Sequence, residues 1–421
     1  MKTVLRSIVA GMLAALARGI LAKYEPKIVM VTGSVGKTST KDAVAACLSE
    51  RYFLRASEKS YNSEFGVPLT IIGAKNPWTS FSAWLGVFAH GLSLLLFPNH
   101  YPKLLVLEVG ADRPGDLKQI LRIATPHAVV VTKLPDVPVH VEAYATPEAV
   151  REEEFAPAHA LPAGAPLVIC EEDAHAKRLA RATAATLSTY GFTKDADVSL
   201  GEASVISGSG MRSVATIRQI KYELCVEGAL GRQQLYAPAA ALTLALALGM
   251  KEKEALAGLR NYVPPPGRAR ILPGRNGSIL IDDTYNASPA AVIEIVSALP
   301  LMPGITRRIV VLGDMLELGR YSKEEHARVG KLAAGVAQVI VSVGERAKAV
   351  HEAVAAEREA YHYTNSREAA AALTDFVREG DLVLIKGSQG IRMERITEAL
   401  LRNPQDRGQL VRQDKEWLKK A

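Results

Sequence analysis

The stretch Val29-Met-Val-Thr-Gly-Ser-Val-Gly-Lys-Thr-Ser-Thr40 decides how the first half of the chain is expected to fold. Residues 28–31 are all apolar, which is typical of a buried strand. Gly33 and Gly36 then break the strand, and residues 42–48 suit a helix. A strand, a glycine turn and a helix amino terminus together leave backbone N–H groups unpaired, and such groups bind phosphate.

Lys37 and Thr38 supply the two side chains that a phosphate-binding loop uses. The lysine reaches the terminal phosphates of a bound nucleotide, and the hydroxyl holds Mg²⁺. The full consensus has a glycine five residues before Gly36, where this chain has Val31, so the match is partial. We predict an ATP and Mg²⁺ site here, with a chance glycine turn as the alternative. The expected nucleotide contacts are Gly33, Ser34, Gly36, Lys37, Thr38 and Ser39.

Composition indicates an ordinary soluble protein of two or three domains. The chain has 421 residues, of which 48% are hydrophobic and 23% are charged. Its three cysteines, Cys47, Cys170 and Cys225, lie far apart and form no disulfide or metal pattern. We therefore expect buried thiols in a reducing compartment, and a cytoplasmic protein.

The net charge of +7 is concentrated at the two ends of the chain. Residues 1–27 carry five Lys and Arg against one acid, and residues 402–421 carry six against three. These two surpluses account for the whole excess, so the body of the chain is neutral. A nucleic-acid partner is therefore not expected.

Residues 4–21 are expected to form a basic amphipathic helix. Its uninterrupted apolar part is too short to span a bilayer. The helix is expected either to lie on a membrane or to dock on the protein. A third alternative is a signal peptide, because Ala15-Leu16-Ala17 resembles a cleavage site. The residues on its apolar face are Leu5, Ile8, Val9, Met12, Leu13, Leu16 and Ile20.

The segment from Asn76 to Pro102 contains no Lys, Arg, Asp or Glu. It is long enough to cross a membrane, but a crossing would put the phosphate loop and the strand over residues 104–109 on opposite sides. One sheet cannot be built in that way. A packed helix, or a surface for lipid or a partner, is the expected structure.

Strand-like runs alternate with helical segments, which favours an α/β fold: a phosphate-loop domain with a mostly parallel sheet, and a smaller doubly wound, Rossmann-like domain. Residues 237–250 read as a buried helix, and Pro264-Pro-Pro-Gly267 reads as a stiff hinge. The expected strands are 28–31, 104–109, 128–132, 167–170, 279–281, 308–312, 338–343 and 382–385. The expected divisions are an amino-terminal helix (1–27), a central domain (28–263), the hinge (264–277), a carboxyl-terminal domain (278–402) and a basic tail (403–421).

Polar motifs follow several of these strands, at the sheet edge where open α/β sheets bind ligands. Glu108 ends one strand and is a candidate Mg²⁺ ligand. His140 lies in a proline-rich loop beyond the next strand. The second domain has three such motifs, beginning at Asp282, Gly313 and Lys386. Three motifs in one small domain predict a ligand-binding face.

The chain resembles the Mur ligase family over about residues 28–400, most closely the MurF type, which joins D-alanyl-D-alanine to UDP-N-acetylmuramoyl-tripeptide. The motifs that carry the resemblance are Thr32-Gly-Ser-Val-Gly-Lys-Thr38, Tyr61-Asn-Ser-Glu-Phe-Gly-Val-Pro-Leu-Thr70, Glu108-Val-Gly-Ala111 with Pro114-Gly115, His140-Val-Glu142, Asp282-Asp-Thr-Tyr-Asn-Ala-Ser-Pro289, Leu312-Gly-Asp-Met-Leu-Glu-Leu-Gly319 and Lys386-Gly-Ser388.

The resemblance implies that ATP binds between the two domains and activates a substrate carboxylate as an acyl phosphate, which an amine then attacks. It implies that Lys37 neutralises phosphate charge and that Thr38, Glu108 and His140 position two Mg²⁺ ions. Nucleotide contacts are implied for Arg268, Asp283 and Asn286. Substrate contacts are assigned to Asn62, Asp314, Glu317, Lys386 and Ser388.

The chain also departs from the family pattern. The domain that grips the UDP-sugar is expected to be missing, because about 27 residues precede the phosphate loop. A central Gly-Arg-His-Asn pattern reads Gly231-Arg-Gln-Gln234 here, and a following asparagine is Ala237. The family's carbamylated lysine aligns with Glu154. A glutamate is a permanent anion, so we predict Glu154 as a catalytic group and metal ligand, with a solvated acidic helix face as the alternative.

These observations predict a cytoplasmic ATP-dependent amide ligase of the MurF kind, with a peripheral position at the inner membrane face as the alternative location. Its expected partners are a small-molecule or lipid-linked cell-wall precursor and D-Ala-D-Ala or a similar amine. The alternatives are a catalytically weak Mur-like scaffold at the membrane, and the same ligase chemistry on a folate or poly-amino-acid acceptor.

Overall fold

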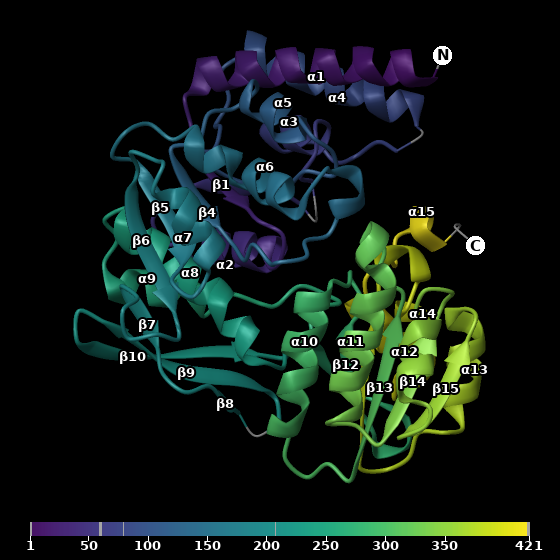
Figure 1. The fold of residues 1–421 in the computed structure, drawn as a ribbon. Coiled ribbons are helices and arrows are strands. Elements are labelled where there is room, and N and C mark those ends of the chain that lie inside the picture. The colour runs from purple at the N-terminus through teal and green to yellow at the C-terminus, as the bar shows by residue number, and fades with distance from the viewer. Residues whose placement is uncertain (1, 59–60, 79, 207, 419–421) are drawn as a thin grey trace.

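Two α/β units follow one another along the chain (Figure 1). The computed structural model describes residues 2–58, 61–78, 80–206 and 208–418. Within these residues the first unit is built on a ten-stranded sheet and the second on a six-stranded sheet. The expected α/β class, with a larger phosphate-loop sheet and a smaller doubly wound one, is confirmed.

The strand that leads into the phosphate loop, β1, is third from the β2 edge of the first sheet. The strand order is β10-β9-β7-β6-β5-β4-β1-β3-β2, with β8 also paired to β9. Pairing is parallel from β2 through β7 and antiparallel where β8, β9 and β10 are added. The strands are β1 (Lys27–Thr32), β2 (Leu54–Ala56), β3 (Leu104–Glu108), β4 (Ala128–Val131), β5 (Pro166–Cys170), β6 (Thr186–Gly191), β7 (Val198–Leu200), β8 (Ser204–Val205), β9 (Gly210–Ile217) and β10 (Ile220–Glu227).

Helices cover both faces of this sheet, because alternate residues of its strands point to opposite sides. Val29 and Val31 join one buried cluster with α2 (Lys37–Leu48), α8 (Tyr236–Ala247) and α9 (Glu252–Leu259). Ile28 and Met30 join the other cluster. The helices of that second cluster are α1 (Lys2–Tyr24), α3 (Gly66–Ile72), α4 (Phe81–Leu96), α5 (Asp116–Leu121), α6 (Pro147–His159) and α7 (Ala174–Ala180).

The second sheet has the order β11-β12-β16-β13-β14-β15 and is parallel except for β11. Its strands are β11 (Arg270–Pro273), β12 (Ile279–Asp283), β13 (Arg307–Gly313), β14 (Val339–Val343), β15 (Glu359–Tyr363) and β16 (Asp381–Lys386). Its helices are α10 (Pro289–Ala298), α11 (Ser322–Ala334), α12 (Lys348–Val354), α13 (Ser366–Thr374), α14 (Glu394–Leu400) and α15 (Lys415–Leu418). Short 3₁₀ helices are η1 (Val141–Ala143), η2 (Arg232–Leu235), η3 (Arg275–Gly277), η4 (Leu299–Leu301), η5 (Gly319–Tyr321), η6 (Gln389–Ile391) and η7 (Pro404–Gln409).

Two expected boundaries need correction. The range 264–277, expected to be a hinge, contains β11, which pairs with β12 as the edge strand of the second sheet. The range 403–421, expected to be a basic tail, begins as part of the second unit. Leu410 joins the core there, and the buried Arg412 forms an ion pair with Glu394. The hinge is therefore shorter, and the second unit longer, than expected.

The amino-terminal helix α1 is docked on the protein. Leu13, Ala17 and Ile20 are fully buried in the second cluster, and α1 contacts α3 and α4. Residues 6–24 are long and apolar enough to cross a membrane by length and composition, and 17% of that window is buried. The uncharged segment 76–102 contains α4, which lies beside α1 (Figure 1).

Candidate active site

The loop between β1 and α2 has the backbone shape that phosphate binding needs. Gly33 and Gly36 have φ values of +115° and +91°, a region that glycine enters at little cost. A Cβ on Gly33 would lie 2.4 Å from the Thr132 hydroxyl, so a larger residue would push the loop off its neighbour. Gly36 precedes α2, and no side chain caps this helix. The N–H groups at its start are therefore left for a ligand.

Glu154 lies behind this loop and is 1% exposed. Its Oε2 accepts hydrogen bonds from the Gly33 N–H at 3.0 Å and from the Thr32 hydroxyl at 3.2 Å. Its Oε1 lies 3.5 Å from the Lys37 ammonium, which also donates to the Gly33 carbonyl. Burial raises the pKa of Glu154, and Lys37 opposes that rise. The predicted metal ligand is thus bonded to the loop and its lysine instead.

Glu108, at the end of β3, faces the start of α2. Its Oε1 accepts a hydrogen bond from the Thr38 hydroxyl at 3.1 Å, and Arg268 donates to the same hydroxyl oxygen at 3.3 Å. Glu108 is 2% exposed, and its Oε2 has no hydrogen-bond partner. Burial raises its pKa, against the pull of Lys41, Lys37 and Arg268.

An unpartnered, buried carboxylate oxygen beside a threonine hydroxyl fits a Mg²⁺ ion, which prefers oxygen ligands and keeps several of its waters. The described residues contain no group of three or more His, Cys, Asp or Glu that could hold a metal. Glu108 and Thr38 would therefore hold the ion together with water and nucleotide oxygens. His140 and Glu154, predicted as further ligands, do not complete a protein cage.

His140 instead contacts the second unit. Its Nδ1 lies 2.7 Å from Oε2 of Glu317, and its Nε2 lies 3.5 Å from the carboxylate of Asp112. Burial disfavours the charged imidazole, but these two carboxylates outweigh it and raise the pKa of His140. The hydrogen bond from His140 lowers the pKa of Glu317. Both residues have a positive φ, +66° for His140 and +65° for Glu317.

The second unit presents its own polar groups at the carboxyl ends of β12 and β16. Lys386 is 2% exposed, and its ammonium donates to Asp283 at 2.6 Å and to the Asn286 carbonyl at 2.9 Å. Burial lowers the pKa of Lys386, although Asp283 opposes this. The hydroxyl of Ser388 accepts from the N–H of Leu316 at 2.9 Å.

A cavity of about 460 Å³ lies between these two sets of residues. It brings together most of the side chains that the sequence predicted. The predicted residues that line it are Ser34, Gly36, Lys37, Thr38, Asn62, Glu108, His140, Arg268, Asn286, Glu317 and Ser388. Three predicted residues lie behind its walls. Gly33 and Glu154 lie under the phosphate loop, and Asp314 accepts a hydrogen bond from the N–H of Ala347 at 2.7 Å.

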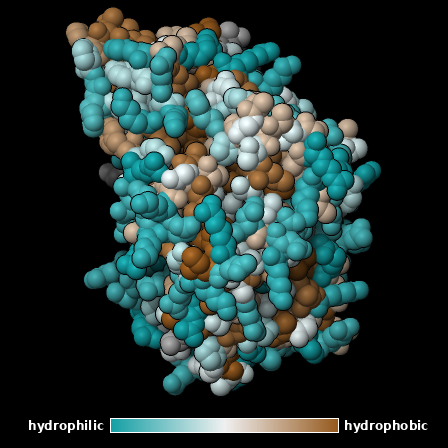
Figure 2. Space-filling model, turned by 90° about the vertical axis from the view of Figure 1, so that its left-hand side faces the viewer, coloured by the Kyte–Doolittle hydropathy of each residue, from teal (hydrophilic) through white to brown (hydrophobic). Residues whose placement is uncertain are grey.

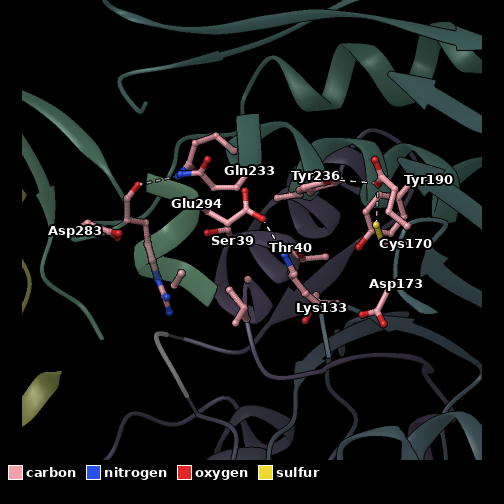
Figure 3. A pocket seen from close by; sticks show the side chains of 18 of the residues that line it. Ser39, Thr40, Lys133, Cys170, Asp173, Tyr190, Gln233, Tyr236, Asp283 and Glu294 are labelled. Carbon is pink, nitrogen blue, oxygen red and sulfur yellow. Dashed lines mark hydrogen bonds and ion pairs between the residues drawn. The ribbon is translucent and has the colours of Figure 1, made fainter. Parts of the chain in front are cut away.

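A smaller cavity of about 170 Å³ adjoins the phosphate loop (Figure 3). Tyr190, Tyr236 and Cys170 gather at one end of it and Asp283 lies at the other (Figure 3). The rings of Tyr190 and Tyr236 meet edge to face at 6.1 Å. Ser39, Asp283 and Lys386, predicted from the sequence, also line this cavity.

Sequence reasoning missed the two tyrosines, because neither lies in a glycine or charge motif. In the sequence, the nearby Gln233, Gln234 and Ala237 stand out only as departures from a family pattern, and all three line this cavity. The available signals were separate: Tyr190 is an aromatic residue at the end of β6, and Tyr236 directly follows the polar 3₁₀ turn η2.

A third cavity, of about 820 Å³, begins beside Thr38 and Arg268 and extends to Trp78, just before α4. Tyr61 and Phe65 line its apolar wall. It shares Thr38 and Arg268 with the cavity between the units, so a long substrate could reach the phosphate loop from this side.

Two models of known families match the chain. The Mur ligase middle domain matches residues 88–245, and the Mur ligase glutamate ligase domain matches residues 267–389. The UDP-N-acetylmuramoyl-tripeptide–D-alanyl-D-alanine ligase of Bacillus subtilis is 25% identical over 93% of this chain and 79% of its own length. The enzyme of the same name from Mycobacterium tuberculosis is 28% identical over 93% of this chain and 77% of its own.

Solved structures agree with these matches. The crystal structure of the Thermotoga maritima MurF ligase in complex with ADP has a TM-score of 0.77 and 26% identity, and covers 93% of this chain and 83% of its own. The folylpolyglutamate synthase of Mycobacterium tuberculosis has a TM-score of 0.66 at 15% identity, over 92% of this chain and 94% of its own, which shows a shared fold alone. The two matched domains together cover more than half of the chain, which belongs to the Mur ligase family and is an ATP-dependent ligase.

Proposed function

We propose that this protein is a MurF-type ligase that joins D-alanyl-D-alanine, or a similar amine, to the peptide of a cell-wall precursor. The observation that carries the proposal is the 460 Å³ cavity between the units. Lys37, Thr38 and Glu108 line one side of it, and Asn286 and Ser388 line the other. The names of the relatives supply the substrates.

In this proposal the phosphates of ATP bind at the start of α2. Lys37 and Arg268 neutralise charge on the phosphate that is transferred, where such contacts strengthen in the transition state. The base occupies the smaller cavity, next to Tyr190 and Tyr236, whose rings offer apolar surface. Asp283 supports the nucleotide from the second unit.

Thr38 and Glu108 are the proposed protein ligands of Mg²⁺, which would offset charge on the phosphate oxygens when bound. The free Oε2 of Glu108 supports this assignment. His140 reaches the same cavity and remains the predicted ligand for a second ion.

The chemistry follows in two steps. A carboxylate oxygen of the acceptor attacks the γ-phosphorus, the bond to the bridging oxygen breaks, and ADP leaves with that electron pair. The amine then attacks the acyl carbon, and the tetrahedral intermediate expels phosphate while the nitrogen loses a proton. Lys386 and Ser388, on the second unit, are proposed to orient the amine. Catalysis of this kind depends mainly on positioning and on charge stabilisation.

We further propose that the protein works in the cytoplasm and that its acceptor is a small-molecule or lipid-linked wall precursor. The 820 Å³ cavity supports a peptide acceptor, because it extends from Thr38 and Arg268 to the aromatic side chain of Trp78. Asn62, between the phosphate loop and this region, is a proposed acceptor contact.

Phosphate release with defined substrates tests the proposal. Purified protein is incubated with Mg-ATP, UDP-N-acetylmuramoyl-tripeptide and D-alanyl-D-alanine, each omitted in turn, and the product is identified by mass spectrometry. Release that needs all three, with a product of the expected mass, is the expected result. If phosphate release instead requires a folate or a poly-amino-acid acceptor, that acceptor would take the place of the proposed cell-wall substrate. No turnover with any acceptor, despite ATP binding, would favour a scaffold.

A further inference from the structure

Helices α1 and α4 share an outer surface that is exposed and apolar. We call it the α1–α4 face and define it by Ile8, Met12, Phe81, Leu85, Leu92, Leu96 and Phe97. Their exposed fractions are 54%, 48%, 76%, 55%, 50%, 65% and 63%. Figure 2 shows hydrophobic side chains gathered at the upper left of the molecule, at the level of these two helices in Figure 1. Scattered apolar residues are normal on a surface, but a continuous set of this size indicates a binding surface.

The apolar character of α4 exceeds what docking on the protein requires. Val87, Gly91 and Leu94 already bury one side of the helix. Phe81, Leu85, Leu92 and Leu96 recur at helical spacing on the opposite side, as one stripe along the helix.

Helix α1 extends this stripe. Its Leu16 side chain packs beside Gly91, and Leu95 of α4 packs beside Gly19. At 3.6 residues per turn, Ile8 and Met12 lie on the same side of α1 as Leu16. The two helices therefore present one joint apolar face.

The charges of the two helices have a single sign. Helix α4 contains no charged residue, and α1 contains Lys2, Arg6, Arg18 and Lys23 but no acid; Arg6 is ion-paired with Glu64 outside these helices, at 2.8 Å. Lys23 donates to the carbonyls of Leu94, Leu95 and Phe97, which holds its positive charge at the end of the α4 stripe. The exposed Arg18 lies on the outer side of α1.

We propose that the α1–α4 face docks on an anionic lipid surface, with both helices lying parallel to it. An apolar face flanked by basic groups suits the boundary between headgroups and acyl chains, where anionic lipids attract Lys and Arg. A second copy of the chain is a poor occupant, since pairing two such faces would bring basic groups together with no acid on either helix. Leu13, Ala17 and Ile20 are buried against the protein, so α1 lies on the membrane and does not cross it.

Docking in this orientation would bring the membrane close to Trp78, which lies just before α4 and lines the 820 Å³ cavity. A lipid-linked acceptor could then pass its peptide toward Thr38. This link rests on the proposed function, whereas the docking itself does not.

Co-sedimentation with vesicles tests the proposal on the full chain. The probes are vesicles of phosphatidylcholine alone and of phosphatidylcholine with phosphatidylglycerol. We expect binding to the anionic vesicles that weakens with salt, and little binding to the neutral ones. The variant Leu85→Glu/Leu92→Glu should lower anionic-vesicle binding about tenfold or more. The matched control is Val214→Glu/Ile220→Glu, at two exposed apolar residues of β9 and β10, and should bind normally.

ATP turnover and the melting temperature of each variant are measured alongside, so loss of folding or of ligase activity is scored separately from vesicle binding. Absence of binding to anionic vesicles would overturn the proposal, as would equal binding of the Leu85/Leu92 variant and the parent. Light scattering supplies a further contrary outcome. If the parent forms a dimer in the absence of vesicles and the Leu85/Leu92 variant is a monomer, the α1–α4 face would instead bind a second copy of the chain.

Discussion

His140 and Glu317 join the two units at the edge of the active-site cavity, with 2.7 Å between Nδ1 and Oε2. His140 comes from the loop after β4 and Glu317 from the loop after β13. Each has a left-handed backbone conformation, so both loops are shaped to present these side chains. The pair therefore closes one side of the cavity without contributing to either core.

The first prediction is that this contact weakens on the alkaline side when Mg²⁺ is absent. The pKa of His140 is raised above its ordinary 6.5, so its contribution is complete below that value and is lost as the pH rises through the raised pKa. The pKa of Glu317 is lowered from 4.5, so its contribution is lost only as the pH falls through that lower value. We expect small-angle scattering to show a larger radius of gyration at pH 8.5 than at pH 6.

Glu317→Gln should remove most of this pH dependence, because a neutral amide gains little from a charged imidazole. His90→Gln, at an exposed histidine of α4, is the matched control and should leave the dependence unchanged. An identical pH profile in the Glu317 variant and the parent would show that other groups set the separation of the units.

The second prediction concerns Lys37. Lys37→Ala should lower turnover by about 10²- to 10³-fold, since a charge contact to the transferred phosphate is lost in the transition state. Phosphate release under saturating ATP measures this effect. Lys118→Ala, at an exposed lysine of α5, should be near normal. Full activity of the Lys37 variant would show that the assignment of a phosphate-binding loop is wrong.

The third prediction concerns Glu154, which the resemblance to the family leads us to expect in place of a carbamylated lysine. Glu154 is a permanent anion 3.5 Å from Lys37, so activity should not depend on added bicarbonate. Glu154→Gln keeps an acceptor for the Gly33 N–H but removes the charge that holds Lys37, and it should raise the KM for ATP and the Mg²⁺ requirement together.

Glu152→Gln, two residues away on the exposed side of α6, should do neither and is the control for Glu154. Equally mild effects of both substitutions would show that Glu154 has only a structural role. Loss of activity in bicarbonate-free buffer would point to a modified lysine elsewhere.

The fourth prediction is that residues after 403 stabilise the second unit. Arg412 donates to Glu394 at 2.8 Å and to the Tyr285 carbonyl at 3.1 Å. Glu394 is 1% exposed, so Arg412→Ala would leave a buried carboxylate with Arg392 alone. We expect a loss of about 3 kcal/mol in the free energy of unfolding by urea. Arg260→Ala, at an exposed arginine, should change it by less than about 0.5 kcal/mol. A small effect at Arg412 would mean that water replaces the arginine.

The strands that position the site could be predicted because they are buried on both faces and read as unbroken apolar runs, as in residues 28–31. The second half of the first sheet was harder to foresee. Strands β9 and β10 have one exposed face, so their apolar residues alternate with polar ones and no glycine motif marks them. Strand β11 follows a proline run, which reads as a break in structure.

Side-chain direction explains the remaining differences in the site. A helical acid such as Glu154 has the same sequence signature whether it faces water, a metal or the backbone of a neighbouring loop. Only the packing of α6 against β1 turns it toward Gly33. Asp314 likewise follows a strand, as predicted, but it bonds to the N–H of Ala347 in the wall of the second unit.

Arg268 follows the Pro264–Gly267 turn directly, and it contacts both units. Its guanidinium donates to the Thr38 hydroxyl in the first unit and lies 4.1 Å from the ring centre of Tyr285 in the second. A rotation of one unit against the other must therefore move or break one of these two contacts. In the proposed ligase, opening of the molecule would therefore displace Arg268 beside the phosphate loop, so that opening and the release of ADP would be coupled.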